Sequence, residues 1–362
     1  MRKNKTIYLS GLNGIRAIAA IAVIISHIGL NLELYVIPNL GGYALASFGV
    51  TMFFALSGFL ITYLLLREKE KTNTIKVRKF YFRRILRIWP LYYFYLIITL
   101  AVIGFTVNQY SWMYIFLLPN VPFTLNASGL FAATLPYLNH YWSVGVEEQF
   151  YAFWPWIVKK SKKIFFAMFI FSILFFLMKV VLSMLDAPKF ILTLLHYTRF
   201  GCLAMGGVGA YLLIQQNNLF LKIVQHKVLE VSAWLIILLI AINRFHIFSI
   251  IDHEIVTIAT LVIIINQVNN SRRLISLENK VFDYLGKISY GLYIYNPLII
   301  FLVSLLLKNY LSPYYSVNII LIYSITILVV IGVSHLSYFY FEKRFLTIKD
   351  KFAVVKSKSS AS

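Results

Sequence analysis

An arginine and a histidine lie eleven residues apart in the first apolar segment of the chain, at Arg16 and His27 of LNGIRAIAAIAVIISHIGL. Eleven residues make close to three α-helical turns, so both side chains share one helix face, about 16 Å apart along the axis. Ionisable groups inside a membrane usually face a cavity, a water-filled pathway or each other. The pair therefore predicts a polar pathway in which His27, a natural general base, takes a proton from a hydroxyl. Alternatively, His27 could simply bond a neighbour, and Arg16 could reach the membrane surface.

A cluster of arginines follows in FRRILRIWP. Arg83 and Arg87 are four residues apart and Arg84 and Arg87 three apart, which predicts that they gather on one side of a helix start. Arginine forks match phosphate geometry, so this cluster could bind the phosphates of a cytoplasmic coenzyme. The alternative is the ordinary positive charge of a cytoplasmic loop.

Two adjacent carboxylates, Glu147 and Glu148, enter an apolar span in HYWSVGVEEQFYAFWP, just after the plausible N-cap Ser143. They project in different directions, so at most one can share a cavity wall with His27. That carboxylate could orient or charge-stabilise the imidazole, as in a His–acid pair. Acidic residues in the first turns could also simply complement the helix dipole.

Two further segments contain small or polar side chains. Ser57 and Gly58 in FFALSGFLI could line the same cavity or allow close helix packing. Tyr290, Tyr293 and Asn296 in KISYGLYIYNP could form hydrogen bonds within a bundle. The chain shows no phosphate-binding glycine loop, no dinucleotide fingerprint and no spacing of metal ligands, so we expect no metal site.

The composition predicts a membrane protein. Of the 362 residues, 60% are hydrophobic and only 13% are charged, well below the proportion in soluble domains. The net charge of +21 comes from lysines and arginines in short connectors, as the positive-inside rule expects. We therefore expect contact with the lipid bilayer and no nucleic-acid partner. The single cysteine, Cys202, excludes an intrachain disulfide framework.

The elements that must position these residues are about ten transmembrane helices in an all-α bundle with both termini in the cytoplasm. The expected spans are residues 11–30, 47–66, 86–107, 142–158, 164–185, 195–214, 228–243, 250–268, 288–307 and 318–341. Residues 108–141 are broken by prolines, and we expect one short interfacial or re-entrant segment there rather than two crossings. Residues 1–345 form the transmembrane domain, and 346–362 form a short basic tail expected to be disordered. No removable signal peptide is expected.

Together these motifs resemble the acyltransferase 3 family of integral membrane acyltransferases. GLNGIRAIAAIAVIISH resembles the family's opening motif, and FFALSGFLI, FRRILRIWP, YWSVGVEEQFYAFWP and YGLYIYNP follow in the family's order. The resemblance covers about residues 11–345. It implies transfer of an acyl group, usually acetyl, from cytoplasmic acyl-CoA to a hydroxyl of a glycan or related acceptor.

The resemblance also implies roles for particular residues. His27 would be the catalytic histidine, supported by Glu147 or Glu148. The coenzyme side would be served by Arg16, Arg83, Arg84 and Arg87. Contacts to the acyl or acceptor groups would come from Ser57, Trp142, Ser143 and Asn296. Two positions depart from the family pattern: Asn13 stands where an Asp is usual, and Asn296 where a His is common.

The sequence thus predicts a membrane O-acyltransferase of the cytoplasmic membrane, which uses acetyl-CoA as co-substrate and a cell-surface glycan or glycolipid as acceptor. We expect a continuous polar tunnel from Arg16 to His27. Direct transfer and an acyl-histidine intermediate both fit the residues. A transporter of a glycan or small solute is the alternative, because intramembrane charges also mark transport pathways. Whether the chain forms a homo-oligomer, and whether it needs a separate partner, stays open.

Overall fold

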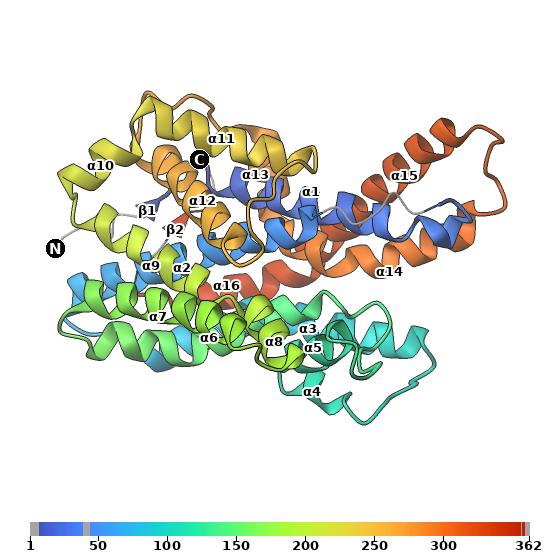
Figure 1. Cartoon of the computed structure of the whole chain (residues 1–362), viewed down its shortest axis with the longest axis horizontal. Coiled ribbons are helices and arrows are strands. Elements are labelled where there is room, and N and C mark those ends of the chain that lie inside the picture. Colours follow the sequence, from blue (N-terminus) through green and yellow to red (C-terminus); the bar gives the residue numbers. More distant parts are fainter. Residues whose placement is uncertain (1–6, 39–43, 356, 359–362) are drawn as a thin grey trace.

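The computed structural model describes residues 7–38, 44–355 and 357–358, and most of them are helical (Figure 1). The first half contains α1 (Leu12–Leu30), η1 (Leu32–Tyr35), α2 (Leu45–Thr72), α3 (Val77–Val102), α4 (Trp112–Ile115), α5 (Asn120–Ala127), α6 (Tyr141–Lys160) and α7 (Ile164–Met184). The second half contains α8 (Lys189–Thr198), α9 (Phe200–Ile214), α10 (Asn218–Val224), α11 (Lys227–Ala241), α12 (Asp252–Asn269), α13 (Lys280–Lys287), α14 (Ser289–Leu307), α15 (Tyr315–Leu336), η2 (Ser337–Glu342) and α16 (Lys343–Lys351).

The helices make this an integral membrane protein. Within the described part of the chain, six helices are long and apolar enough to cross a bilayer, and the bent pair α10–α11 would make a seventh. Each of the ten expected spans overlaps a helix, but the count of ten crossings is not confirmed. One reason is that the expected span 195–214 is interrupted at Arg199, where the backbone is left-handed, so that α8 and α9 are separate helices.

The proline-broken stretch between α3 and α6 contains only the short helices α4 and α5. They have four and eight residues, and a crossing needs about 20. The segment thus contains two short helices where we expected one, and neither is long enough to cross a bilayer.

Close packing of small residues brings α2 against α1 and α9. A Cβ atom on Gly49 would lie 2.9 Å from the carbonyl oxygen of Ala19 on α1. A Cβ atom on Gly58 would overlap the carbonyl oxygen of Leu203 on α9. Glycine lets helix backbones approach in this way inside a membrane. Gly58 therefore serves helix packing, while its neighbour Ser57 faces a cavity described below.

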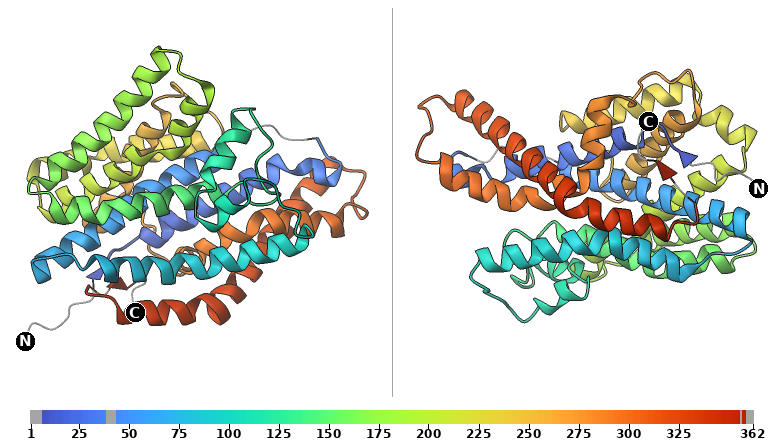
Figure 2. Two further views of the ribbon diagram at one scale, coloured as in Figure 1. Left: turned by 90° about the horizontal axis from the view of Figure 1, so that it is seen from below. Right: turned by 180° about the vertical axis from the view of Figure 1, so that it is seen from behind.

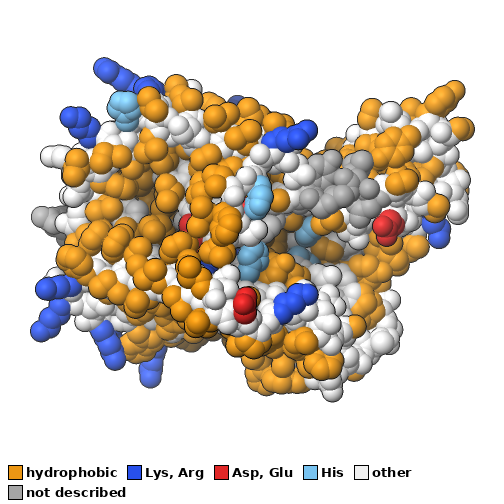
Figure 3. Space-filling view, in the orientation of Figure 1, with side chains coloured by type: hydrophobic (Ala, Val, Ile, Leu, Met, Phe, Trp, Pro, Cys, Tyr) orange, Lys and Arg blue, Asp and Glu red, His pale blue; other side chains and the backbone are white. Residues whose placement is uncertain are grey.

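The two ends of the chain meet at one end of the bundle. β1 (Ile7–Tyr8) pairs in parallel with β2 (Ser357–Lys358). Lysine and arginine side chains gather at the left end of the molecule in Figure 3, and they are fewer on the right. This distribution agrees with the concentration of lysines and arginines in the connectors between apolar segments.

The C-terminal tail is more ordered than expected. Helix α16 continues without a break across residue 345 and runs along α3 (Figure 2). The Nη1 atom of Arg83 on α3 donates to the carbonyl oxygen of Phe352, 3.1 Å away. An amphipathic helix that finds a partner surface folds even when its composition alone predicts disorder. Residues 356 and 359–362 of the expected tail lie outside the described residues.

Candidate active site

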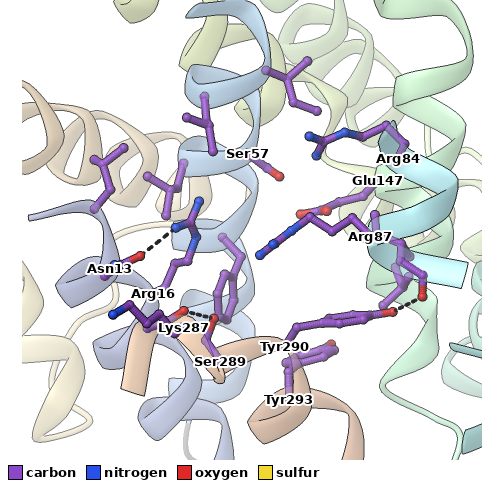
Figure 4. A pocket seen from close by; sticks show the side chains of 18 of the residues that line it. Asn13, Arg16, Ser57, Arg84, Arg87, Glu147, Lys287, Ser289, Tyr290 and Tyr293 are labelled. Atoms are coloured by element: carbon purple, nitrogen blue, oxygen red, sulfur yellow. Dashed lines mark hydrogen bonds between the residues drawn. The ribbon is translucent and has the colours of Figure 1, made fainter. Parts of the chain in front are cut away.

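A cavity of about 320 Å³ lies inside the bundle, and side chains from both halves of the chain line it (Figure 4). Its walls are formed by α1, α2, α3, α6, α13, α14 and the C-terminal segment that contains α16. Five cationic side chains line it: Arg16, Arg84, Arg87, Lys287 and Lys349. The carboxylates in the lining are Glu147 and Asp350, so cations outnumber anions by five to two.

Most of this positive charge is not neutralised by a direct ion pair. Among the described residues, no carboxylate oxygen lies within 4.0 Å of the charged groups of Arg16, Arg84, Arg87 or Lys287. The Nη1 atom of Arg16 donates instead to the neutral amide oxygen of Asn13, at 3.0 Å. A low-polarity surrounding makes such uncompensated charge costly. The cavity is therefore suited to an anionic ligand.

The two arginines from α3 approach the cavity from the wall opposite Arg16 (Figure 4). The guanidinium of Arg84 lies over the rings of Phe80 and Tyr151, 5.9 and 5.8 Å from their centroids. Its Nε atom is buried and has no hydrogen-bond partner. Buried polar atoms without partners are rare in native proteins. This atom is therefore a further sign that the site takes a ligand with acceptor oxygens.

Arg83 points elsewhere. Its Nη2 atom lies 3.0 Å from the Oε2 atom of Glu68, in a largely buried ion pair, and it does not line the cavity. Consecutive residues of a helix point about 100° apart, so Arg83 and Arg84 cannot face one ligand together. The cluster read from the sequence divides into a structural arginine and two cavity arginines.

The adjacent carboxylates also separate, as the helix geometry predicts. Glu147 lines the cavity and accepts a hydrogen bond from the hydroxyl of Tyr151 at 2.8 Å. That hydroxyl also accepts from Ser57 on α2, at 2.5 Å. Glu148 faces away from the cavity and accepts from the indole nitrogen of Trp89 at 2.9 Å. In the described structure neither carboxylate is hydrogen-bonded to His27.

The partner of His27 is Asn296 of α14. The Nδ1 atom of His27 lies 2.6 Å from the Oδ1 atom of Asn296. The amide nitrogen of Asn296 is committed to the carbonyl oxygens of Leu292 and Tyr293, at 3.0 and 2.7 Å. Its oxygen must therefore face the histidine, so Nδ1 carries the proton and Nε2 keeps its lone pair. This arrangement gives His27 the tautomer that a general base needs.

The cavity does not extend to His27, and a hydrogen-bonded pair lies in its lining on α6 and α14. The hydroxyls of Ser143 on α6 and Tyr293 on α14 lie 2.6 Å apart. Both residues line the inner end of the cavity, while His27 is not among its lining residues. The expected tunnel from Arg16 to His27 is therefore interrupted in this structure.

Trp142 lies beside this region rather than in the cavity. Its ring stacks on Phe123, with centroids 5.5 Å apart, and the Arg199 guanidinium lies 5.4 Å from the indole. It contributes to the packing that positions the first turn of α6.

Comparison with known proteins identifies the family. A family model described as an acyltransferase domain, that of acyltransferase 3, matches residues 9–338. The chain belongs to this acyltransferase family. A Staphylococcus aureus (strain COL) protein, provisionally named an O-acetyltransferase, is 29% identical over 93% of this chain and 57% of its own length. The O-acetyltransferase OatA of Staphylococcus aureus (strain NCTC 8325 / PS 47) is 26% identical over 92% of this chain. This acyltransferase chain thus spans a little over half the length of these relatives. No solved structure matches it.

Sequence reasoning missed two cations of this acyltransferase's cavity, Lys287 and Lys349. Lys287 ends α13 and reads in the sequence as an ordinary connector residue. Lys349 lies in the segment that we expected to be disordered. Its Nζ atom is 3.4 Å from the Oδ1 atom of Asp350. The docking of α16 on α3 brings Lys349 to the cavity, and the packing of α13 on α1 brings Lys287 there.

Proposed function

We propose that this chain is a membrane O-acyltransferase that transfers an acetyl group from cytoplasmic acetyl-CoA to a hydroxyl of a cell-surface glycan or glycolipid. Membership of the acyltransferase family and the names of the O-acetyltransferase relatives support O-acyl transfer. The observation that carries the proposal further is the cavity itself. Four of its five cations have no direct ion pair among the described residues, and a histidine on α1 lies near it with one ring nitrogen available as an acceptor.

The cationic cavity is the proposed donor site. Phosphate groups of coenzyme A would accept hydrogen bonds from Arg84 and Arg87, whose planar forks suit phosphate oxygens. Arg16, Lys287 and Lys349 would add positive charge from three other helices. The protein would lie in the cytoplasmic membrane. Because the coenzyme is cytoplasmic, the basic end of the bundle and both chain termini would then face the cytoplasm.

The acyl group would then have to pass the pair formed by Ser143 and Tyr293. A neutral hydrogen bond contributes only about 0.5–1.5 kcal/mol net. Both hydroxyls can exchange their mutual bond for one to an amide or carbonyl group of the pantetheine arm. The interruption of the tunnel is therefore compatible with passage of the narrow arm, while the bulky nucleotide stays in the cavity.

The reaction would occur beside His27. Its Nε2 atom takes the proton of the acceptor hydroxyl while the hydroxyl oxygen attacks the acyl carbonyl carbon. The carbon–sulfur bond then breaks, and the leaving thiolate of coenzyme A receives the proton from His27. Asn296, rather than a carboxylate, would hold the ring in place. Glu147 would balance the arginine charges and orient Tyr151. An acyl-histidine intermediate remains an alternative for the first half of the transfer.

Incubation of membranes with radiolabelled acetyl-CoA tests this function. We expect label in the cell-envelope glycan, lost by His27→Ala and kept by His335→Ala, a control histidine on α15 that is bonded to Tyr284 instead. Mass spectrometry of surface glycans from cells with and without the protein would identify the acceptor. Transport of a glycan or solute without acyl transfer would refute the enzyme and favour the transporter.

A further inference from the structure

His140 is the least satisfied polar side chain next to the proposed reaction site. It caps the start of α6, and only 4% of its surface is exposed. Neither ring nitrogen has a hydrogen-bond partner, although the backbone of Ile294 lies near, outside hydrogen-bond geometry. Buried imidazole nitrogens are almost always paired, so two unpaired nitrogens on one ring need an explanation.

The ring of His140 is held in place by its surroundings. It contacts the rings of Tyr95, Tyr141 and Tyr293 edge to face, with centroids 5.8, 5.1 and 5.5 Å away. Its own carbonyl oxygen accepts a hydrogen bond of 2.8 Å from the hydroxyl of Tyr293. The ring is thus fixed without any polar contact of its own, which is the arrangement of a group held ready for a ligand.

The ring of His140 also faces His27. The two ring centroids are 6.5 Å apart, and the ring planes cross at 71°. A hydrogen bond to a ring nitrogen spans about 2.7–3.2 Å, so the two rings are near enough to each other to contact the same substrate group. His140 lies three residues, close to one helical turn, before the cavity residue Ser143, so it is close in the chain to the cavity and in space to His27.

We propose that His140 is a second catalytic residue, whose ring N–H binds the carbonyl oxygen of the acyl group. This inference rests on the proposed function. When the acceptor oxygen bonds to the acyl carbon, its proton moves to Nε2 of His27 and the carbonyl electron pair moves onto oxygen. The neutral His140 ring donates to that oxygen, and its proton stays on nitrogen. The carbon–oxygen double bond then re-forms as the carbon–sulfur bond breaks, and the coenzyme leaves as the thiol with the proton from His27.

The two histidines are suited to different halves of this step. Asn296 fixes His27 with a free lone pair, so His27 can accept the hydroxyl proton. In its neutral form His140 carries one N–H that no protein group accepts. A donor aimed at a developing oxyanion in a site without water is one of the larger contributions to catalysis.

Substitution of His140 separates this role from a structural one. His140→Phe keeps an aromatic ring beside the three tyrosines but removes the N–H donor. His140→Gln keeps an N–H donor. We expect His140→Phe to lower kcat about 10²- to 10³-fold, as for loss of an oxyanion donor, with KM for acetyl-CoA nearly unchanged. His140→Gln should recover a measurable part of kcat, and His335→Phe on α15 should behave as the unmodified chain.

Each outcome for the His140 variants either supports or overturns the proposed role of His140. Rates of His140→Phe close to those of the unmodified chain would overturn the inference and leave the acyltransferase intact. A rise in KM with unchanged kcat would also overturn it, because His140 would then bind the donor without acting on the transition state. If the unmodified chain transfers no acetyl group from acetyl-CoA, the proposed function fails, and the role of His140 fails with it. Gel filtration and thermal unfolding of each variant show whether loss of kcat reflects loss of fold. If His140→Phe does not fold, an inactive His140→Gln that folds would contradict the inference.

Discussion

The hydrogen bond between His27 and Asn296 gives the sharpest prediction. Asn296→Ala removes the acceptor 2.6 Å from Nδ1 and creates little new contact. Nothing then selects the tautomer with a free Nε2 or holds the ring toward the acceptor hydroxyl. An unsatisfied buried partner costs about 1–3 kcal/mol, and each 1.36 kcal/mol is tenfold in rate, so kcat should fall about 5- to 150-fold.

The assay is the initial rate of acetyl transfer in membranes that contain equal amounts of folded protein. Because Asn296 is proposed to act only through His27, its effect should disappear when His27 is absent. In the His27→Ala chain, the additional change Asn296→Ala should leave the residual rate nearly unchanged, a strong non-additivity. Equal losses in both backgrounds would refute the positioning role, since Asn296 would then support the fold or the donor site instead. Unchanged kcat in Asn296→Ala would refute it as well.

Three further predictions concern the cavity and its walls. Replacing Arg84 and Arg87 together by Lys should raise KM for acetyl-CoA, because lysine lacks the planar fork of arginine. Arg83→Ala should mainly lower the unfolding temperature, because it breaks the ion pair with Glu68. The reverse pattern would assign the coenzyme to Arg83. Glu147→Gln keeps an acceptor for Tyr151 and should lower kcat less than His27→Ala does; equal losses in rate assays would make Glu147 part of the proton transfer. Gly58→Ala should destabilise the protein by about 1–3 kcal/mol through overlap with Leu203, and unchanged thermal unfolding would show that α2 and α9 can separate at no cost.

The parts of the fold that follow from helical periodicity could be predicted from the sequence. Arg16 lines the cavity and His27 lies further along the same helix, as the eleven-residue spacing indicates. Glu147 and Glu148 diverge because neighbouring helix positions point about 100° apart. The same rule could have separated Arg83 from Arg84, but the spacing to Arg87 suggested a single cluster. Helical periodicity predicts the direction in which each side chain points from its own helix. It says little about which residue of another helix that side chain contacts.

Contacts between distant segments could not be predicted. Asn296 meets His27 across 269 positions of the chain, and no feature of YIYNP identifies its partner. Lys349 reaches the cavity only because α16 packs on α3, and the amphipathic pattern of that segment does not identify the surface on which it packs. His140 had no particular signal either, since a histidine at the start of a span is usually structural. These residues became candidates only through burial and missing partners.

The partners of each buried charge separate structural ions from functional ones in this protein. Arg199 is 1% exposed, yet its guanidinium donates to the carbonyl oxygens of His196 and Ser47 and to the hydroxyls of Ser47 and Thr51. Lys179 is instead paired with a carboxylate, that of Glu254, 2.8 Å away. The hydrogen-bonding groups of such buried ions are satisfied within the protein, and the bonds hold helices together. Arg84 has a buried nitrogen without a partner and faces a cavity in which cations predominate. Burying an unsatisfied charge is unfavourable, and this cost fits the coenzyme site proposed at Arg84, whereas hydropathy alone would class Arg199 and Arg84 alike.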